Sequence, residues 1–329
     1  MDFSQLMQLA TGHAEARIVQ TALELHVFEA FAKESRPAKA VATELSLQPA
    51  ACELLLNALA ALKLVNKTDE MFSLAPAARQ YLLEGSPQYL GGMIRFESSL
   101  WGCWEALPYA VRSGKPARPA DMYQANPQET EIFIGAMDSL VKARGDVKAL
   151  ADALDWRGVE EMLDVGAGPA TYPIGLCQSF PRLRVTIFDL SATLKITERR
   201  IREADLSPRI RLIAGDYRVD PIPGNYDLIF LSNIIHGENA AINEALMCKL
   251  AGSLKPSGRL IIKDHVLDES RAEPPVGAIF SVLMLLTTAG GRCYSLREIR
   301  GWMERAGLKR VEEIKLPAPL NSSLVVAGW

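Results

Sequence analysis

The segment 161–171, with the sequence EMLDVGAGPAT, constrains the fold of this chain more than any other. Its apolar residues 162–165 predict a buried strand, and Gly166 and Gly168 follow in a tight turn before a predicted helix. A glycine lets backbone approach a ligand that a Cβ would hold away, and a helix N-terminus offers unpaired N–H groups. Asp164 lies at the carboxyl end of the strand, where open α/β sheets bind their ligands.

Four further segments repeat this pattern of an apolar strand followed by polar side chains. Intervals of about one βα unit separate them, which predicts a mostly parallel, Rossmann-like sheet. Because the carboxyl ends of parallel strands meet at one edge of a sheet, these polar residues should lie close together. The predicted strands are 183–189, 210–216, 226–231 (followed by Ser232, Asn233 and His236) and 259–264.

The N-terminal part is organised differently, with three predicted helices over 14–31, 38–45 and 48–64 and a hairpin over 64–74. This order predicts a winged helix, for which DNA binding is one possible role. A DNA recognition helix is basic, whereas 48–64 carries Lys63 as its single basic residue. We therefore predict that this face is buried in a homodimer and that nucleic acid is not a partner.

Composition supports a two-domain globular protein. The chain has 329 residues, 49% of them hydrophobic, and a net charge of −3, so we predict two domains. The predicted winged helix, expected to be the dimerisation domain, lies within 1–95, and the predicted sheet with its leading helices lies within 96–329. Five scattered cysteines without a C-x-x-C pair indicate free thiols. The start lacks a basic signal-peptide region, and the longest apolar run, 276–286, is too short to cross a membrane. We expect a cytoplasmic protein without a membrane partner.

Further helices and strands are predicted around the sheet. Residues 129–154 read as one long helix, and 276–288 as an almost wholly apolar helix that should be deeply buried. Ser295 and Glu298 predict a capping box at the start of a helix that ends at Gly307. Strands over 311–316 and 323–327 close the chain.

Taken together, these motifs resemble those of the class I S-adenosylmethionine (SAM) methyltransferases. The similarity is greatest to the small-molecule O-methyltransferases of the plant caffeate type and the bacterial hydroxyneurosporene and polyketide types, and it covers nearly the whole chain. The resemblance implies a seven-stranded, mostly parallel SAM methyltransferase sheet preceded by an all-α winged-helix domain that forms an intertwined homodimer. The matching segments are DVGAGPA (164–170), FDL (188–190), GDY (215–217), SNIIH (232–236) and LKPSGRL (254–260).

The resemblance implies SAM as cofactor and S-adenosyl-L-homocysteine as product. The residues also favour SAM over a nicotinamide dinucleotide, whose loop has Gly or Ala where Thr171 stands. An acid at Asp164 suits the α-ammonium of SAM and disfavours a pyrophosphate. The predicted cofactor residues are Asp164, Gly166, Gly168, Asp189, Leu190, Asp216, Tyr217, Ser232 and Met137.

These residues have different predicted contacts. Asp189 suits ribose hydroxyls, and Asp216 with Tyr217, where the family has Met or Phe, suits adenine. Each aspartate alone would also fit a cap or turn, but three at successive strand ends favour a cofactor site. Ser232 stands where several relatives place a lysine near the adenosine. By resemblance Met137 packs near the SAM thioether, although a methionine on an apolar helix face is often core filler.

Methyl transfer from a sulfonium is a direct displacement, so the enzyme must align the acceptor and remove its proton. Histidine suits this role near neutral pH. His236 stands at the family's catalytic position and is the predicted base, with His265 as a weaker candidate. Asp264 stands where relatives have the first supporting acid. Cys293 replaces the second acid, and residues 237–239 also depart from the family pattern.

We predict a SAM-dependent O-methyltransferase acting on a small aromatic or apolar hydroxyl compound. The departures at Cys293 and 237–239 leave open a second hypothesis, a SAM-binding protein of the same fold used for binding or for a non-methylating reaction. The shared cofactor half also leaves N-, S- and C-methylation open. No metal site and no serine hydrolase is predicted, because neither ligand spacing nor a G-x-S-x-G elbow is present.

Overall fold

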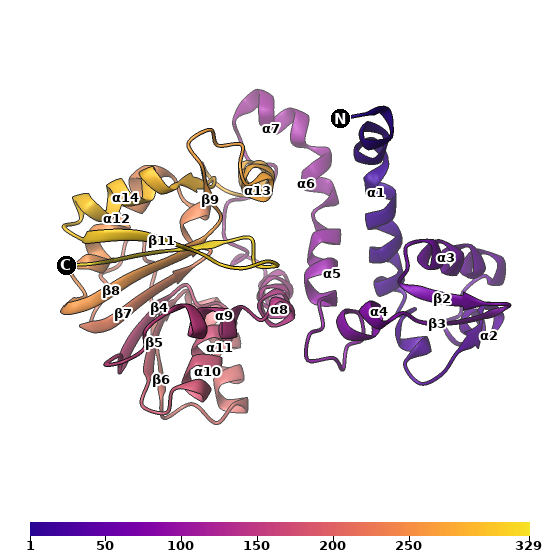
Figure 1. Ribbon diagram of the computed structural model, residues 1–329, viewed down its shortest axis with the longest axis horizontal. Coiled ribbons are helices and arrows are strands. Elements are labelled where there is room, and N and C mark those ends of the chain that lie inside the picture. Colours follow the sequence, from indigo (N-terminus) through magenta and orange to yellow (C-terminus); the bar gives the residue numbers. More distant parts are fainter. The chain divides into compact units, whose positions relative to one another are not determined.

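The computed structural model of the protein describes residues 1–329, which form two compact units (Figure 1). The first unit comprises Met1–Leu100 with Gly135–Ala143, and the second comprises Trp101–Ile134 with Arg144–Trp329. None of the helices combines the length and the apolar content that crossing a membrane would require.

The first unit is mainly helical and contains the predicted hairpin. A short strand at 36–37 pairs with the hairpin, so that the sheet has three strands in the order β1-β3-β2. Phe28, Phe31, Leu56, Leu59 and Phe72 are among the residues of its core. The elements are α1 (Phe3–Glu24), η1 (Glu29–Phe31), β1 (Arg36–Pro37), α2 (Ala38–Glu44), α3 (Pro49–Ala61), β2 (Val65–Thr68), β3 (Met71–Leu74), α4 (Pro76–Tyr81) and α5 (Gly91–Ser99).

The predicted bounds of the first helix are wrong. Helix α1 begins eleven residues before residue 14, at Phe3, because Asp2 and Gln5 form a capping box there. It ends at Glu24, since His26 takes a left-handed φ of 54° and leads into η1. The turn also changes which side chains are buried. Phe28 is buried, whereas Leu25 is exposed.

The second unit contains a seven-stranded sheet in the order β11-β12-β8-β7-β4-β5-β6, which confirms the predicted fold class. The five strands from β8 to β6 are parallel, and β12 pairs antiparallel with both β8 and β11. The strands are β4 (Glu161–Val165), β5 (Arg184–Asp189), β6 (Ile210–Ala214), β7 (Tyr226–Ser232), β8 (Leu254–Asp264), β11 (Lys309–Lys315) and β12 (Ser323–Gly328).

Helices cover both faces of this sheet, as the right-handed βαβ connection requires (Figure 1). On one face lie α9 (Asp146–Ala153), α10 (Thr171–Ser179) and α11 (Ser191–Glu203), and on the other α12 (Ala240–Ala251) and α14 (Leu296–Arg305). The central strands are therefore buried on both faces, which explains their unbroken apolar sequences. The remaining elements are α6 (Trp101–Glu105), α7 (Leu107–Ser113), α8 (Pro127–Arg144), η2 (Ile235–Gly237), β9 (Val266–Leu267), α13 (Pro275–Thr287) and β10 (Tyr294–Ser295).

Two predictions about helices in this part of the chain are wrong, and one is confirmed. Residues 129–154 form two helices because Gly145, with φ of 71°, separates α8 from α9. Helix α13 is not deeply buried throughout, since Ile279 is 64% exposed. The capping box of Ser295 and Glu298 is confirmed at the start of α14.

Candidate active site

The loop after β4 presents backbone at the edge of the sheet. Gly166 and Gly168 have φ values of 70° and 54°, in the region that glycine tolerates. A Cβ on Gly166 would lie 2.4 Å from Cδ1 of Ile234, so a larger residue would not fit. Ala170, where the family's third glycine falls, also takes a positive φ of 59° and precedes α10, whose N-terminus has no side-chain cap. The close backbone and the uncapped helix fit a bound ligand.

The side chain of Asp164, near the end of β4, has no hydrogen-bond partner within the protein. Its side chain is buried, at 1% exposure, and neither Oδ1 nor Oδ2 accepts a hydrogen bond. Burial, together with the charge of Asp189, raises the pKa of this carboxyl well above its ordinary value. A buried acid without a donor destabilises a fold, so two unpartnered acceptors beside a glycine loop fit a cationic ligand such as the α-ammonium of SAM.

Asp189 at the end of β5 ties two loops of the site together. Its Oδ2 accepts from the backbone N–H of Gly168 at 2.9 Å, and its Oδ1 accepts from that of Leu190 at 2.7 Å. Burial raises the pKa of Asp189 to about 6, although the two backbone hydrogen bonds act in the opposite direction. Each oxygen retains a lone pair, so the predicted contact with ribose hydroxyls is compatible with these bonds.

The residues predicted near adenine have partners that the sequence did not indicate. The guanidinium of Arg218 binds both oxygens of Asp216, with Nη2 at 2.8 Å from Oδ2. The Tyr217 hydroxyl donates to Oε1 of Glu238 at 2.7 Å. Roles for Asp216 and Tyr217 in binding the cofactor stay predictions.

Two other predicted cofactor residues lie in different compact units. Ser232 ends β7, where its Oγ accepts from Nδ2 of Asn233 at 3.2 Å. Met137 belongs to the first compact unit, whereas the glycine loop belongs to the second. Their predicted contacts with SAM stay predictions.

His236, in η2 after β7, and Asp264, the last residue of β8, form a hydrogen-bonded pair. Nδ1 of His236 lies 2.8 Å from Oδ1 of Asp264, which also accepts from the backbone N–H of His265 at 2.7 Å. Burial acts to raise the pKa of Asp264, but the charges and hydrogen bonds of His236 and His265 together outweigh it and the pKa is lowered. The ionised carboxylate favours the proton on Nδ1, which leaves Nε2 of His236 as a hydrogen-bond acceptor.

Apolar and neutral groups surround this pair. The ring of Phe280 meets the His236 imidazole edge-on, with centroids 4.8 Å apart, and its centroid lies 5.2 Å from that of His265. Burial lowers the pKa of His265, whose Nδ1 donates to the carbonyl of Asn321 at 2.8 Å. Burial first, and then the charge of Asp264, raise the pKa of Cys293 to about 12. Cys293 is therefore a neutral thiol at the position where the resemblance implies a second acid.

A buried charged cluster beneath the site was not predicted. Nζ of Lys263, inside β8, lies 3.1 Å from Oδ2 of Asp146, and the hydroxyl of Tyr172 donates to the same oxygen at 2.8 Å. Arg144 also pairs with this carboxylate at 2.8 Å. Asp146 begins α9 and Tyr172 lies in the first turn of α10, so the cluster fixes both helices, and with them the glycine loop, to β8. A lysine within an otherwise apolar strand is the sequence feature that could have indicated this cluster.

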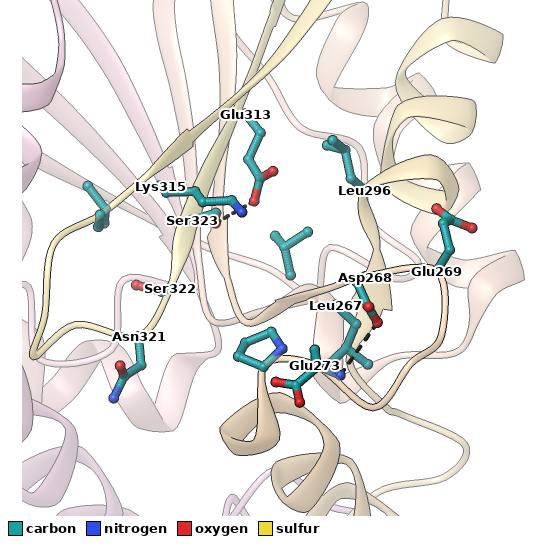
Figure 2. Close-up of a pocket in the computed structure, with 13 residues that line it drawn as sticks. Leu267, Asp268, Glu269, Glu273, Leu296, Glu313, Lys315, Asn321, Ser322 and Ser323 are labelled. Carbon is teal, nitrogen blue, oxygen red and sulfur yellow. Dashed lines mark hydrogen bonds between the residues drawn. The ribbon is translucent and has the colours of Figure 1, made fainter.

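A separate cavity of about 540 Å³ lies between β9, the start of α13 and the ends of β11 and β12 (Figure 2). Carboxylates and one lysine line it alongside apolar side chains. None of the predicted catalytic or cofactor residues is part of its wall. The cavity is therefore distinct from the site described above, although Asn321 belongs to both surroundings. Its charged residues are Asp268, Glu269, Glu273, Glu313 and Lys315.

Comparison with known protein families shows which family this chain belongs to. The O-methyltransferase domain family matches residues 104–309. The chain belongs to this family. The O-methyltransferase dimerisation domain matches residues 7–84 of this O-methyltransferase, and the predicted family and SAM dependence are confirmed.

Similar proteins align with this chain over almost its whole length. A 3-hydroxy-5-methyl-1-naphthoate 3-O-methyltransferase of Streptomyces sahachiroi is 29% identical over 330 residues, covering 98% of this chain and 94% of the relative. The tetracenomycin polyketide synthesis 8-O-methyl transferase TcmO of Streptomyces glaucescens is 28% identical, covering 95% and 94%. The solved structure of human N-acetylserotonin methyltransferase in complex with SAM has a TM-score of 0.90 at 22% identity, covering 100% of this chain and 98% of that one. This structural likeness confirms the fold.

Proposed function

We propose that this O-methyltransferase methylates a hydroxyl group of a small aromatic acceptor, with His236 as general base and Asp264 as its orienting acid. The observation that carries the proposal is the 2.8 Å hydrogen bond between Nδ1 of His236 and Oδ1 of Asp264. It leaves Nε2 of His236 able to accept a proton at the sheet edge that carries Asp164 and the glycine loop.

The residues that would hold SAM follow from the fit of the site. The carboxylate of Asp164 would accept from the α-ammonium, the backbone at Gly166 and Gly168 would lie against the methionine part, and Asp189 with Leu190 would contact the ribose. When bound, SAM supplies the methyl group from its sulfonium. Asp216, Tyr217 and Ser232 are proposed around the adenosine, and Met137 near the thioether.

Residues of the protein itself take up the proton that the acceptor hydroxyl loses. Nε2 of His236 accepts the proton of the acceptor hydroxyl, and the Asp264 carboxylate stabilises the imidazolium that forms. A positioned general base of this kind contributes roughly 10²–10⁴ in rate. Phe280 shields the imidazole from water and gives it an apolar surface on which an aromatic acceptor could pack.

We propose a fused-ring phenol as acceptor class, because two relatives are named for naphthoate and tetracenomycin methylation. The test is incubation of the purified protein with SAM and either 3-hydroxy-2-naphthoate or 3-amino-2-naphthoate, followed by mass spectrometry. We expect a methyl ether from the phenol and no methylated amine. Methylation of the amine alone would contradict the proposal of O-methylation.

A second candidate is a SAM-binding protein of the same fold used for binding or for a non-methylating reaction. The neutral Cys293 in place of the second acid favours it. Saturable SAM binding without methyl transfer to any hydroxyl acceptor would support this candidate.

SAM binding should depend on pH because burial raises the carboxyl pKa values of Asp164 and of Asp189, the latter to about 6. Below that pH the free protein holds Asp189 protonated, and the raised pKa of Asp164 acts in the same direction, whereas a cationic ligand favours ionised carboxylates. We therefore expect SAM affinity to fall as the pH drops below about 6, and SAM binding to release protons. Calorimetric titrations in two buffers with different ionisation enthalpies measure the release. Proton uptake would contradict this prediction.

We propose that the N-terminal domain, residues 1–95, forms the homodimer and that residues 96–329 form the catalytic domain. Helix α1 exposes apolar side chains, with Leu6 56% and Leu9 69% exposed, and the dimerisation family matches from residue 7. Exposed leucines on one helix are typical of a surface that a partner covers.

Replacing Leu6 and Leu9 together with glutamate should convert the dimer to monomer, because two charges would have to be buried at the interface. Size-exclusion chromatography with light scattering gives the mass. Gln8→Glu with Ala14→Glu is the matched control, since both residues are exposed on α1, and it should stay dimeric. If the Leu6→Glu/Leu9→Glu variant stays dimeric, this surface of α1 is not the dimer interface.

A further inference from the structure

Two departures from the family sequence pattern meet in the structure. Tyr217 carries a hydroxyl where the family pattern that the sequence resembles has Met or Phe, and Glu238 lies in the stretch 237–239, which departs from that pattern. They are 21 residues apart, and the Tyr217 hydroxyl donates to Oε1 of Glu238 at 2.7 Å. Glu238 is 6% exposed, so this hydrogen bond is shielded from water.

Glu238 directly follows the turn η2, which carries His236. The backbone of this turn is held from the α12 and β10 sides. Nδ2 of Asn243 donates to the carbonyl of Ile235 at 2.8 Å, and the Tyr294 hydroxyl donates to the carbonyl of Glu238 at 2.6 Å. The Glu238 side chain adds the contact with the loop that follows β6, on the predicted adenine side of the cofactor site.

Close packing leaves this turn little freedom. A Cβ on Gly291 would lie 2.3 Å from the carbonyl oxygen of His236, so the backbone of the turn touches the segment that precedes β10. The Tyr217–Glu238 hydrogen bond ties the turn to a different segment, the loop that follows β6. Because a buried acceptor that loses its donor costs more than an average hydrogen bond gains, removing the Tyr217 hydroxyl should displace Glu238.

We propose that Glu238 is a positioning residue for His236, and that its hydrogen bond with Tyr217 fixes the turn of the base to the cofactor side of the site. The inference rests on the proposed function, in which His236 removes the acceptor proton. The turn is supported through its backbone and through the Glu238 side chain. Glu238 does not touch the reacting atoms and acts through His236.

Kinetics with SAM and 3-hydroxy-2-naphthoate test the proposal. Glu238→Ala and Tyr217→Phe should each lower kcat by about 10-fold to 100-fold, since small displacements of a catalytic group have effects of this size. Glu238→Gln should stay within about three-fold, because its amide oxygen can still accept from Tyr217. The KM for SAM should change by less than about three-fold in Glu238→Ala. A matching loss in Glu238→Gln and Glu238→Ala would overturn the proposal.

Tyr226→Phe is the matched control for loss of a buried tyrosine hydrogen bond. The Tyr226 hydroxyl donates to the carbonyl of Pro223 at 2.8 Å, at the start of β7 and away from the ligand edge. This variant should lower Tm to a similar degree as Tyr217→Phe and leave kcat unchanged. Equal losses of kcat in both variants would indicate a general stability effect and overturn the positioning role.

Failure of this inference can be told apart from failure of the proposed function. If Glu238 acts through His236, Glu238→Ala should cause no further loss of rate in the His236→Ala background. Full turnover of His236→Ala itself would overturn the proposed base. Loss of rate in His236→Ala, followed by a full additional loss from Glu238→Ala, would overturn the positioning role alone.

An NMR measurement tests the same point without an acceptor. The chain has four histidines, so the imidazole Hε1 signal of His236 can be assigned as the one missing from His236→Ala. Glu238→Ala and Tyr217→Phe should shift this signal, whereas Glu238→Gln and Tyr226→Phe should leave it in place. An unshifted signal in Glu238→Ala would overturn the inference.

Discussion

His236→Ala should lower kcat by about 10²–10⁴-fold while the protein still binds SAM. The alanine removes Nε2, the group proposed to accept the hydroxyl proton, but leaves Asp164, Asp189 and the glycine loop in place. The measurements are kcat with 3-hydroxy-2-naphthoate and a calorimetric titration with SAM. Unchanged turnover would remove His236 from the role of base.

Two further results would support this reading of His236→Ala. Its residual rate should rise with pH up to the point where the phenol itself ionises, because an ionised acceptor needs no base. His265→Ala is the matched control, since His265 lies beside the pair but is held by the Asn321 carbonyl, and it should lose less than about ten-fold. A larger loss of kcat in His265→Ala than in His236→Ala would assign the role of general base to His265.

Asp164→Asn should weaken SAM binding by about 10-fold to 100-fold and, in the same protein without cofactor, raise Tm. A hydrogen bond to a charged group contributes about 1.5–3 kcal/mol, which corresponds to this range of affinity. The gain in Tm follows from the unpartnered, buried carboxylate, since the amide removes a group whose charge is costly to bury.

The direction of the pH effect on Asp164→Asn follows from the raised pKa of Asp164. A carboxyl with a higher pKa in the folded state than in the unfolded state reduces stability as the pH rises above its ordinary range. The stabilisation by Asp164→Asn should therefore be larger at about pH 8 than at about pH 5. Asp205→Asn, which removes the charge of an exposed acid, is the control and should change neither Tm nor SAM affinity appreciably. A lower Tm in cofactor-free Asp164→Asn would show that the carboxylate has an unrecognised partner.

The sequence predicted those features that depend on neighbouring residues. An apolar run that ends at Asp164 or Asp189 sets both a buried strand and the position of its acid, so the parallel direction of these strands could be predicted. The family position of His236 and Asp264 likewise predicted two side chains that the structure brings to 2.8 Å. In each case the local pattern and the parallel sheet together determine the position.

Features that depend on partners far apart in sequence could not be predicted. The Lys263–Asp146 pair joins residues from β8 and α9, and the Tyr217–Glu238 bond joins two loops. Nothing in the local pattern around either residue indicates its partner. The helix break at Gly145 could not be predicted for a different reason. Glycine is tolerated within helices, so its presence alone does not predict a break, and its left-handed φ is visible in the structure alone.

The neutral state of Cys293 affects how the enzyme tolerates oxidants. Thiolates, rather than thiols, react with peroxides and alkylating reagents, and Cys293 is both buried and held protonated. Exchanging an acid for a cysteine therefore adds no reactive sulfur next to the base. Cys248, exposed on α12, is the thiol that such reagents would reach first, so this chain can be labelled on its surface while the site keeps its chemistry.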